Sequence, residues 1–244
     1  MPSLSIVMIV RNEAHCLGEC LASVASIADE IVIADTGSTD ATCDIARQYG
    51  AHLFALEWRN DFAWARNQTL AIARGDWLLH LDADEVLDPD NARKLRAVVD
   101  EDGRGADAIE IYLANYSDDP RAWRWEACSP GDPWARGHAG LIRVGLLRLF
   151  RNGMGFEYRE PVHENISESV RERGGRLKAE DILIHHYGYA GDAARGEVKA
   201  RLYLDIAREK AAQRPDDPKA WRDVAEQALS FGLEEEAEQA CRNA

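Results

Sequence analysis

Residues 76–85 read Asp76-Trp77-Leu78-Leu79-His80-Leu81-Asp82-Ala83-Asp84-Glu85. The apolar run at 77–81, with Gly75 and Asp76 before it and acidic residues after it, is typical of a buried strand in an α/β sheet. Because side chains alternate along a strand, Asp82 and Asp84 are predicted to leave its end on one face. Ligands of open α/β sheets bind beyond the carboxyl ends of the strands, where paired carboxylates suit a hard divalent cation. The alternative reading is an acidic surface turn.

The residues before and after this stretch alternate between strand and helix patterns. Strands are predicted at 4–10, 30–34, 52–56 and 77–81, and helices at 14–27 and 90–99. Two further helices are predicted, one capped by Thr39 or Asp40 and ending at residue 49, the other capped by Asn60 or Asp61 and ending at residue 73. Strands that alternate with helices of this length predict a parallel sheet with helices on both sides.

The pattern changes beyond residue 105. Strands are predicted at 108–113, 141–150 and 181–184, and residues 115–140 form a long irregular insert with Trp123, Trp125 and Trp134. Loops of this length are usually lids or binding loops. The three tryptophans therefore either stack on a ligand, cover a site or pack against the sheet.

Composition narrows the class of protein. The chain has 244 residues, a net charge of −14, 46% hydrophobic and 30% charged residues. These values fit a globular protein with one α/β domain and an appendage, and they argue against a nucleic-acid partner. No apolar stretch approaches the roughly 20 residues that span a bilayer. Five scattered cysteines favour reduced thiols and a cytoplasmic location, and Cys16 and Cys20 favour helix packing over a metal site.

The last part of the chain is predicted to be helical at 193–213, at 218–231 and from 234 to the end. The spacing of Trp221, Ala225, Leu229 and Ala237 resembles a tetratricopeptide helix pair. One repeat cannot bury its own face, so the pair either packs on the preceding domain or was cut from a longer array. The second reading is favoured because the chain ends inside the last helix. We predict a domain at 1–190 and a helical extension at 191–244, with a protein partner or self-association through the helices.

Three segments together resemble family 2 glycosyltransferases of the GT-A fold. They are Met8-Ile9-Val10-Arg11-Asn12-Glu13, Ile31-Val32-Ile33-Ala34-Asp35-Thr36-Gly37-Ser38-Thr39-Asp40 and Leu81-Asp82-Ala83-Asp84-Glu85. Between them, Asp61-Phe62-Ala63-Trp64-Ala65-Arg66-Asn67 is similar to a segment under the sugar diphosphate. The nearest subgroup is that of bacterial lipopolysaccharide-core glucosyltransferases and peptide S-glycosyltransferases, in which Val162-His163-Glu164 and a late His-Tyr-Gly-Tyr recur.

The resemblance spans residues 4–190 and implies both fold and reaction. The implied fold is α/β, a GT-A (Rossmann-like), mostly parallel sheet flanked by helices, here with a C-terminal α-helical extension. The implied reaction is metal-dependent transfer, with inversion, from a nucleotide diphosphate sugar, chiefly a UDP-sugar. The acceptor is a saccharide, a lipid-linked group or a peptide, and the metal is Mn²⁺ or Mg²⁺. Membrane contact is at most peripheral, at the inner face.

The same resemblance assigns a donor site. Asp35 is expected to accept a hydrogen bond from the base or the ribose, Arg66 and Asn67 to contact the phosphates, and Asp82 to contact the ribose or the metal. The alternatives are an Asx turn for Asp35 and an exposed helix face for Arg66 and Asn67. The full set of expected donor-binding residues is Val10, Arg11, Glu13, Asp35, Ser38, Arg66, Asn67 and Asp82; for Arg11 and Glu13 the alternative is a solvated loop charge.

The metal ligands implied by the resemblance are Asp82, Asp84 and His186, with His186 preferred to His185. Inverting transfer needs a general base opposite the leaving group. Glu164 is the candidate, and His163 either orients it or is the base itself; Asp132 and Glu160 are weaker alternatives. A cysteine acceptor would need the base less, because thiols ionise more readily.

Three competing functions can be compared with these patterns. A haloacid-dehalogenase-type phosphotransferase carries Asp-x-Asp after its first strand, whereas here the pair follows the fourth. A dinucleotide oxidoreductase needs a Gly-x-Gly-x-x-Gly after the first strand, which this chain lacks. An interaction protein on an inactive transferase scaffold is disfavoured by the intact Asp82, Asp84 and Glu164.

Overall fold

The parallel half of the sheet is built from the first four predicted strands. The computed structural model describes residues 1–188 and 193–244, with side chains omitted at 193–196. β1 pairs in parallel with β2 and with β4, and β2 pairs in parallel with β3. The four strands therefore end at one edge of the sheet. Their bounds are β1 Leu4–Val10, β2 Glu30–Asp35, β3 His52–Ala55 and β4 Trp77–His80, each within one residue of the prediction.

Antiparallel pairings extend this half into a mixed sheet. β8 pairs antiparallel with β4 and β6, β9 runs parallel to β6, and β5 pairs antiparallel with β9. The order is β3-β2-β1-β4-β8-β6-β9-β5, with β7 on β8. The predicted α/β fold with flanking helices is confirmed. The remaining strands are β5 Glu85–Val86, β6 Ala108–Ser117, β7 Trp125–Ala127, β8 Gly140–Arg151 and β9 Leu177–His186.

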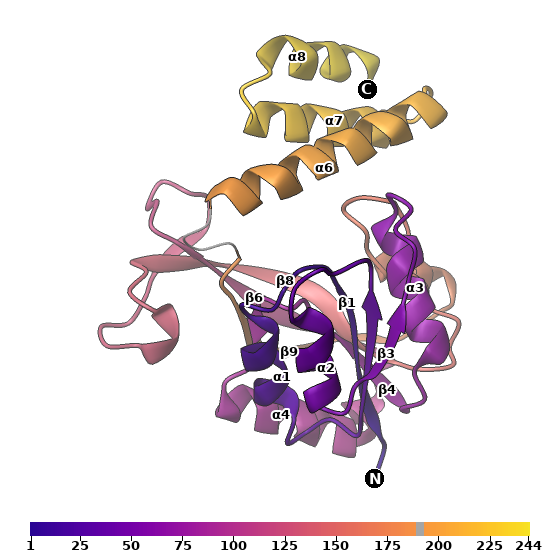
Figure 1. Ribbon diagram of the computed structural model, residues 1–244, viewed down its shortest axis with the longest axis vertical. Helices are drawn as coiled ribbons and strands as arrows, with labels where there is room; N and C mark the ends of the chain where they lie inside the picture. Colours follow the sequence, from indigo (N-terminus) through magenta and orange to yellow (C-terminus); the bar gives the residue numbers. More distant parts are fainter. Residues whose placement is uncertain (189–192) are drawn as a thin grey trace. The chain divides into compact units, whose positions relative to one another are not determined.

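One face of the sheet carries the main hydrophobic core. Alternate residues of β1, such as Leu4, Ile6 and Met8, pack there with the buried sides of α1, α2 and α4 (Figure 1). α4 starts where Asp88 caps it by accepting hydrogen bonds from the amides of Asp90 and Asn91, and Pro89 follows as a favourable first residue. The helices are α1 Leu17–Val24, α2 Thr42–Gln48, α3 Phe62–Ile72 and α4 Pro89–Asp100.

Several elements differ from the predicted ones. β9 is longer than the predicted 181–184 and includes both histidines, because β5 and β6 supply its backbone partners. The insert at 115–140 contains the end of β6, the short β7 and a 3₁₀ turn at Pro133–Ala135, and a second 3₁₀ turn lies at Asp102–Gly105. α5, Ser167–Glu172, was not predicted because six residues are too few for a clear helical period.

The chain divides into two compact units. The first contains Met1–Trp58, Ala65–Glu157 and Ile166–Gly188, and the second contains Arg59–Trp64, Tyr158–Asn165 and the C-terminal helices. These helices are α6 Ala193–Gln213, α7 Pro218–Ser230 and α8 Glu234–Asn243, close to their predicted bounds. The boundary predicted after residue 190, and Tyr189, lie outside the described residues, so that boundary stays a prediction.

Two further properties concern the whole described chain. All five cysteines carry free thiols. Within residues 1–188 and 193–244, no helix combines the length and the apolarity needed to cross a bilayer.

Candidate active site

The carboxyl edge of the parallel strands brings two of the predicted residues to one rim. Asp35 ends β2 in register with Val10 of β1, and His80 ends β4 in register with Val7. Asp82 follows two residues later, so the predicted donor and metal residues after β1, β2 and β4 share this edge. A sheet order that placed Asp35 and Asp82 on opposite rims is excluded.

Asp82 is clamped between two arginines. Its Oδ1 accepts a hydrogen bond from Nη2 of Arg66 at 3.0 Å, and its Oδ2 accepts one from Nη2 of Arg148 at 3.2 Å. Burial alone would raise the pKa of Asp82, but the positive charges of Arg66 and Arg148 hold it well below its usual range. Asp82 is therefore an anion that keeps two guanidinium groups at the strand end.

His80 and Glu85 complete this charge cluster. The His80 ring lies between the same two guanidinium groups, with Arg148 Nη1 2.8 Å from its Nε2. Burial, with the charges of Arg148 and Arg66, lowers the pKa of His80 well below its ordinary value, so the ring is neutral. Glu85 accepts from Arg148 at 2.8 Å, and burial raises its pKa to about 7.

The turn after β4 changes the direction of the chain between the two aspartates. Because the amide of Glu85 donates to the carbonyl of Asp82 at 3.1 Å, residues 82–85 form a turn. The strand alternation that predicted one face for Asp82 and Asp84 thus stops at His80. Asp84 instead faces β9, where its Oδ2 lies 3.3 Å from Nε2 of His186.

His186 is held in place for this contact. Its Nδ1 lies 2.6 Å from Oδ1 of Asn115 on the neighbouring strand β6, so Nε2 is directed to Asp84. Burial opposes protonation of His186, but the hydrogen bond and charge of Asp84 outweigh it and raise its pKa. Among the described residues, the sets of three potential metal ligands lying within 4.8 Å of one another are Glu13–His15–Cys16 and His163–Asp223–Glu226. Asp84 and His186 meet as a pair, and Asp82 is taken up by its arginines.

His185 has a different role from its neighbour. Its Nε2 lies 3.1 Å from Oδ2 of Asp88 and its Nδ1 lies 2.7 Å from the Tyr116 hydroxyl. The residue is 3% exposed, and its ring stacks on Trp134 with centroids 4.9 Å apart. Both ring nitrogens are thus occupied by structural partners.

Asp35 and the loop after β1 form a second polar group at the same rim. The amides of Gly37 and Ser38 donate to the Asp35 carboxylate at 3.1–3.2 Å, which is the Asx-type turn considered from the sequence. Ser38 Oγ accepts from the amide of Asn12, and Asn12 Oδ1 accepts from the amide of Thr39. The turn after β2 is therefore tied to the loop after β1.

The other predicted donor residues lie on these same segments. Val10 is buried at the end of β1, Arg11 is exposed, and Glu13 is half-buried with its amide donating to Thr42 Oγ1. Asn67 is half-buried on α3, one residue after Arg66. Arg66 is 7% exposed, so the alternative of an exposed helix face is wrong for it.

His163 and Glu164, the predicted catalytic pair, belong to the second unit. His163 Nε2 accepts from the side-chain amide of Gln227 at 3.1 Å. Glu160, a weaker candidate for the base, is surrounded by cations in the same unit. Burial would raise the pKa of Glu160, but the hydrogen bond and charge of Lys210 outweigh this effect and lower that pKa. Asp132, the other weak candidate, caps the 3₁₀ turn at Pro133–Ala135 through the amide of Trp134.

The insert packs against the strand that carries His186. Trp134 stacks on His185 with centroids 4.9 Å apart. Tyr116 in turn stacks with His138, His185 and Tyr187 at centroid distances of 5.3–6.0 Å. Trp134 and Trp125 thus have packing roles, since Trp125 donates to the carbonyl of Ser117. Trp123 is 78% exposed and is the tryptophan of the insert that is free to meet solvent or ligand.

Four site residues were not predicted. His80 read as part of an apolar run and Glu85 as part of an acidic turn, and Arg148 as one of several basic residues in a strand. Asn115 carried no signal, because its role depends on the pairing of β6 with β9. A basic residue facing inward on a strand is the signal that could have identified Arg148.

The fold of this chain is shared with a class of enzymes of known structure. The mixed sheet with its flanking helices matches the GT-A fold of glycosyltransferases of known structure. Solved structures with this fold include residues 1–349 of S. aureus TarS in complex with UDP-GlcNAc, with a TM-score of 0.53, 16% identity and coverage of 94% of this chain and 73% of that one. M. tuberculosis glucosyl-3-phosphoglycerate synthase in complex with Mn²⁺, UDP and glucosyl-3-phosphoglycerate gives a TM-score of 0.55 and 16% identity, covering 84% and 78%.

Sequence comparison identifies the family. The model of glycosyl transferase family 2 matches residues 5–174, and the chain belongs to this family. A TPR repeat-containing protein of Synechococcus elongatus is 34% identical over 89% of this chain and 50% of its own length. The prophage-derived glycosyltransferase SunS of Bacillus subtilis is 25% identical over 89% of this chain and 47% of its own length. The chain spans about half the length of these curated relatives.

Proposed function

We propose that the chain transfers a sugar, in a metal-dependent reaction with inversion, from a UDP-sugar to a saccharide, lipid-linked or peptide acceptor. The contact between Asp84 and His186 carries this proposal. It brings a carboxylate and an imidazole together at the edge of the sheet where Asp35 and Asp82 also lie. The complexes of the two structural neighbours with UDP-GlcNAc and with Mn²⁺ and UDP support a uridine nucleotide as donor.

The ligand pair fits a divalent cation. Two ligands that each stand about 2.1 Å from an ion at roughly a right angle are about 3 Å apart, and Asp84 Oδ2 and His186 Nε2 are 3.3 Å apart. Asn115 orients the imidazole as an outer partner of a metal-bound histidine does. Mn²⁺ or Mg²⁺ bound there would act as a Lewis acid on the departing diphosphate.

Asp82 and its arginines are assigned to the donor. Arg66 and Arg148 place two fixed cations at the strand end in a chain with net charge −14, and guanidinium groups recognise phosphate oxygens well. Asp82 then orients these cations and accepts from the ribose, and it is the less direct metal ligand of the predicted set. Asp35 accepts from the base or ribose beside Ser38, and Val10, Arg11, Glu13 and Asn67 complete the donor site.

Glu164 is proposed to deprotonate the acceptor, with His163 beside it in the sequence as orienting residue. Inversion requires one base opposite the leaving group. The ion pairs of Glu160 with Lys210 and Lys219 give that residue a structural role and count against it as the base. Location in the cytoplasm, with at most peripheral contact at the inner membrane face, and recruitment of a partner by tetratricopeptide-like helices, complete the proposal.

A thermal-shift experiment tests the donor and metal assignments together. UDP with MnCl₂ should raise the melting temperature of the chain, and UDP with EDTA should raise it much less, because a ligand that binds only the folded state stabilises it. Asp84→Asn should lose the metal-dependent part of the shift. Asp90→Asn is the matched control. It changes an exposed acid that lies a few residues after Asp84 in the sequence, and it should behave as wild type.

Turnover is the second readout. Metal-dependent hydrolysis of UDP-glucose or UDP-GlcNAc should be present in the wild type and absent in Asp84→Asn. A chain that neither binds UDP nor hydrolyses any sugar nucleotide would instead be an interaction protein on an inactive scaffold, a reading consistent with the name of its S. elongatus relative.

A further inference from the structure

Two short segments belong to the helical unit although they lie far from its helices in the sequence. One lies between β3 and β4, and the other lies between β8 and α5. Arg59–Trp64 leads into α3, and Tyr158–Asn165 is the loop that carries His163 and Glu164. The two segments also touch each other, because the amide of Phe62 donates to the carbonyl of Pro161 at 2.9 Å. The contacts that hold these two segments on α6 and α7 therefore also determine the conformation of the loop that carries Glu164, the candidate base.

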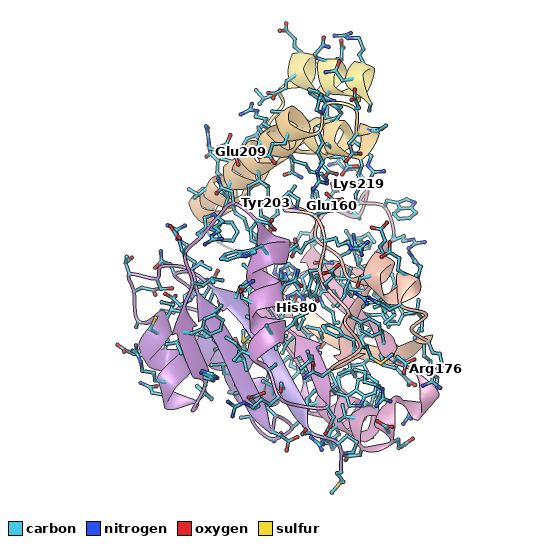
Figure 2. The ribbon with its side chains drawn as sticks, turned by 90° about the vertical axis from the view of Figure 1, so that its right-hand side faces the viewer. His80, Glu160, Arg176, Tyr203, Glu209 and Lys219 are labelled. Atoms are coloured by element: carbon cyan, nitrogen blue, oxygen red, sulfur yellow. The ribbon has the colours of Figure 1, made fainter. Side chains whose placement is uncertain are left out.

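A buried ion cluster connects the loop to both helices. Lys210 of α6 is 2% exposed, and its Nζ lies 2.5 Å from Oε2 of Glu160 and 2.7 Å from Oδ2 of Asp223 on α7. Lys219 and Arg214 contact the same Glu160 carboxylate at 3.4 Å and 3.3 Å. Glu160 and Lys219 are seen side by side in Figure 2. A buried ammonium needs such anionic partners, so Lys210 holds Glu160 and Asp223 together.

The loop backbone is in a conformation that needs external support. Glu160 has φ of 77° and His163 has φ of 54°, both in the left-handed region. Residues other than glycine persist there when the surrounding structure holds them. The Glu160 cluster supplies that support on one side of Pro161.

Aromatic and amide contacts supply it on the other side. Tyr203 of α6 stands edge-on to the ring of His163, with centroids 6.2 Å apart, and edge-on to Phe62 at 5.2 Å. Gln227 of α7 donates to His163 Nε2. Glu209, labelled with Tyr203 in Figure 2, accepts from Asn60 at 3.3 Å. Each helix thus contacts the loop on both sides of Pro161.

We propose that α6 and α7 brace the loop at 158–165, and that Lys210 is a positioning residue for His163 and Glu164. This inference rests on the proposed function, in which Glu164 is the base. The helices then have a role within their own unit that goes beyond binding a partner. A displacement of the base by about 1 Å can lower a rate by about 100-fold. Loss of the contacts that hold the loop should therefore lower kcat.

Three variants of α6 test the brace. Lys210→Gln removes the ammonium that joins Glu160 to Asp223, and Lys210→Arg restores a cation at the same place. Arg208→Gln is the matched control, because Arg208 lies on the same helix and pairs with Glu236 of α8 at 2.7 Å without contacting the loop. Glu160→Gln is a further variant that weakens the loop link and leaves the contact between Lys210 and Asp223, in case Lys210→Gln unfolds the helices.

Hydrogen exchange of the full chain is the first readout. In Lys210→Gln or Glu160→Gln, the amides of residues 158–165 should exchange at least about tenfold faster, while those of β1 and β4 should keep wild-type rates. Lys210→Arg and Arg208→Gln should exchange as wild type in the loop. Wild-type exchange of 158–165 in both Lys210→Gln and Glu160→Gln overturns the brace, whatever the chain's activity.

Turnover of UDP-glucose or UDP-GlcNAc with Mn²⁺ is the second readout. Lys210→Gln should lower kcat about 10- to 100-fold, with KM for the donor within about twofold, an unchanged pH profile and recovery in Lys210→Arg. Unchanged kcat with a loosened loop would show that Lys210 does not position the base. Absence of turnover in the wild type would refute the proposed function, and the exchange result would still decide whether the helices hold the loop.

Discussion

Asp107 connects three strands of the sheet through its carboxylate and its backbone carbonyl. It accepts from the amide, Nε and Nη2 of Arg176 at 2.9–3.0 Å, and its carbonyl accepts from the amide of Arg151. Arg176 is labelled in Figure 2. The hydrogen bonds from Arg176 outweigh burial and hold the pKa of Asp107 well below its usual range. The residues involved precede or end β6, β8 and β9, so this contact fixes the register of the antiparallel half.

We expect Asp107→Asn to lower the free energy of unfolding at pH 7 by about 1–3 kcal/mol, because a buried acceptor of several hydrogen bonds is weakened. A folded-state pKa below the unfolded value of about 4 gives stability that is present above that pH and is lost as the pH falls. The difference between wild type and variant, measured by urea unfolding, should therefore shrink between about pH 5 and pH 2. Asp119→Asn, an exposed acid beside Arg121, is the control and should change little. A difference that is constant with pH would contradict the assigned ionisation.

The adjacent histidines of β9 offer a second test at the scale of single residues. His186→Gln should weaken Mn²⁺ binding at least about tenfold, because loss of an outer partner alone already costs that much. It should also lower the stability of the metal-free chain, because it loses the contacts with Asp84 and Asn115. His185→Gln should leave Mn²⁺ binding nearly unchanged, and because it loses partners on Asp88 and Tyr116 it should cost about 1–3 kcal/mol of stability. Titration calorimetry with MnCl₂ and thermal unfolding measure the two effects. Metal binding that depends on His185 and not on His186 would reverse the assignment.

The space around a glycine differs between Gly75, which precedes β4, and Gly18 in α1, so the same substitution should have different effects at the two positions. A Cβ at Gly75, before β4, would lie 2.5 Å from Ser5 Oγ and 2.7 Å from the Ser5 amide nitrogen of β1. A Cβ at Gly18, in α1, would meet only Ile45 Cγ2 at 3.8 Å. Gly75→Ala should therefore destabilise the chain by about 1–3 kcal/mol through overpacking, and Gly18→Ala should be neutral or stabilising by up to about 1 kcal/mol. Equal melting temperatures for the two variants would show that β1 and β4 can separate without cost.

Elements with strong local patterns were predictable from the sequence, and those defined by a distant partner were not. β1 to β4 each contain an apolar run that ends in turn residues, and α4 carries its own cap at Asp88. β5 and β7 have two and three residues, so their existence depends on β9 and β8. The extent of β9 was underestimated because Lys178 and Glu180 are exposed or half-buried and gave no strand period.

At the scale of the whole molecule, the same distinction governs the candidate site. Asp35, Asp82 and Asp84 follow strands whose ends are local features, so their meeting at one rim could be predicted from strand polarity. Arg148 and Asn115 reach the site through the order of strands in the antiparallel half, which no local pattern encodes. Lys210 reaches the loop at 158–165 from α6, whereas the sequence around it predicted only a helix at 193–213.

The two compact units differ in the kind of core that each contains. The first buries large side chains such as Trp77, Phe150, Leu79 and Ile33 at 0–1% exposure. Among its described residues, the second unit buries the larger side chains Val162, Leu204, Ile206 and Val224 together with a greater number of alanines, which are Ala207, Ala211, Ala220, Ala225, Ala228, Ala237 and Ala240. Burial contributes about 0.8 kcal/mol per CH₂ group, so an alanine core gives each residue much less stability than a leucine or tryptophan core.

We therefore expect the helical unit to open at a lower free energy than the sheet. In native-state hydrogen exchange, amides of α7 and α8 should show protection at least about tenfold below that of β1 and β4, because local opening exposes little apolar surface there. The measurement should be made at two protein concentrations, since self-association through the helices would raise their protection as the concentration rises. Equal protection in α7, α8, β1 and β4 at low concentration would contradict this expectation and would mean that these elements open in one cooperative unfolding event.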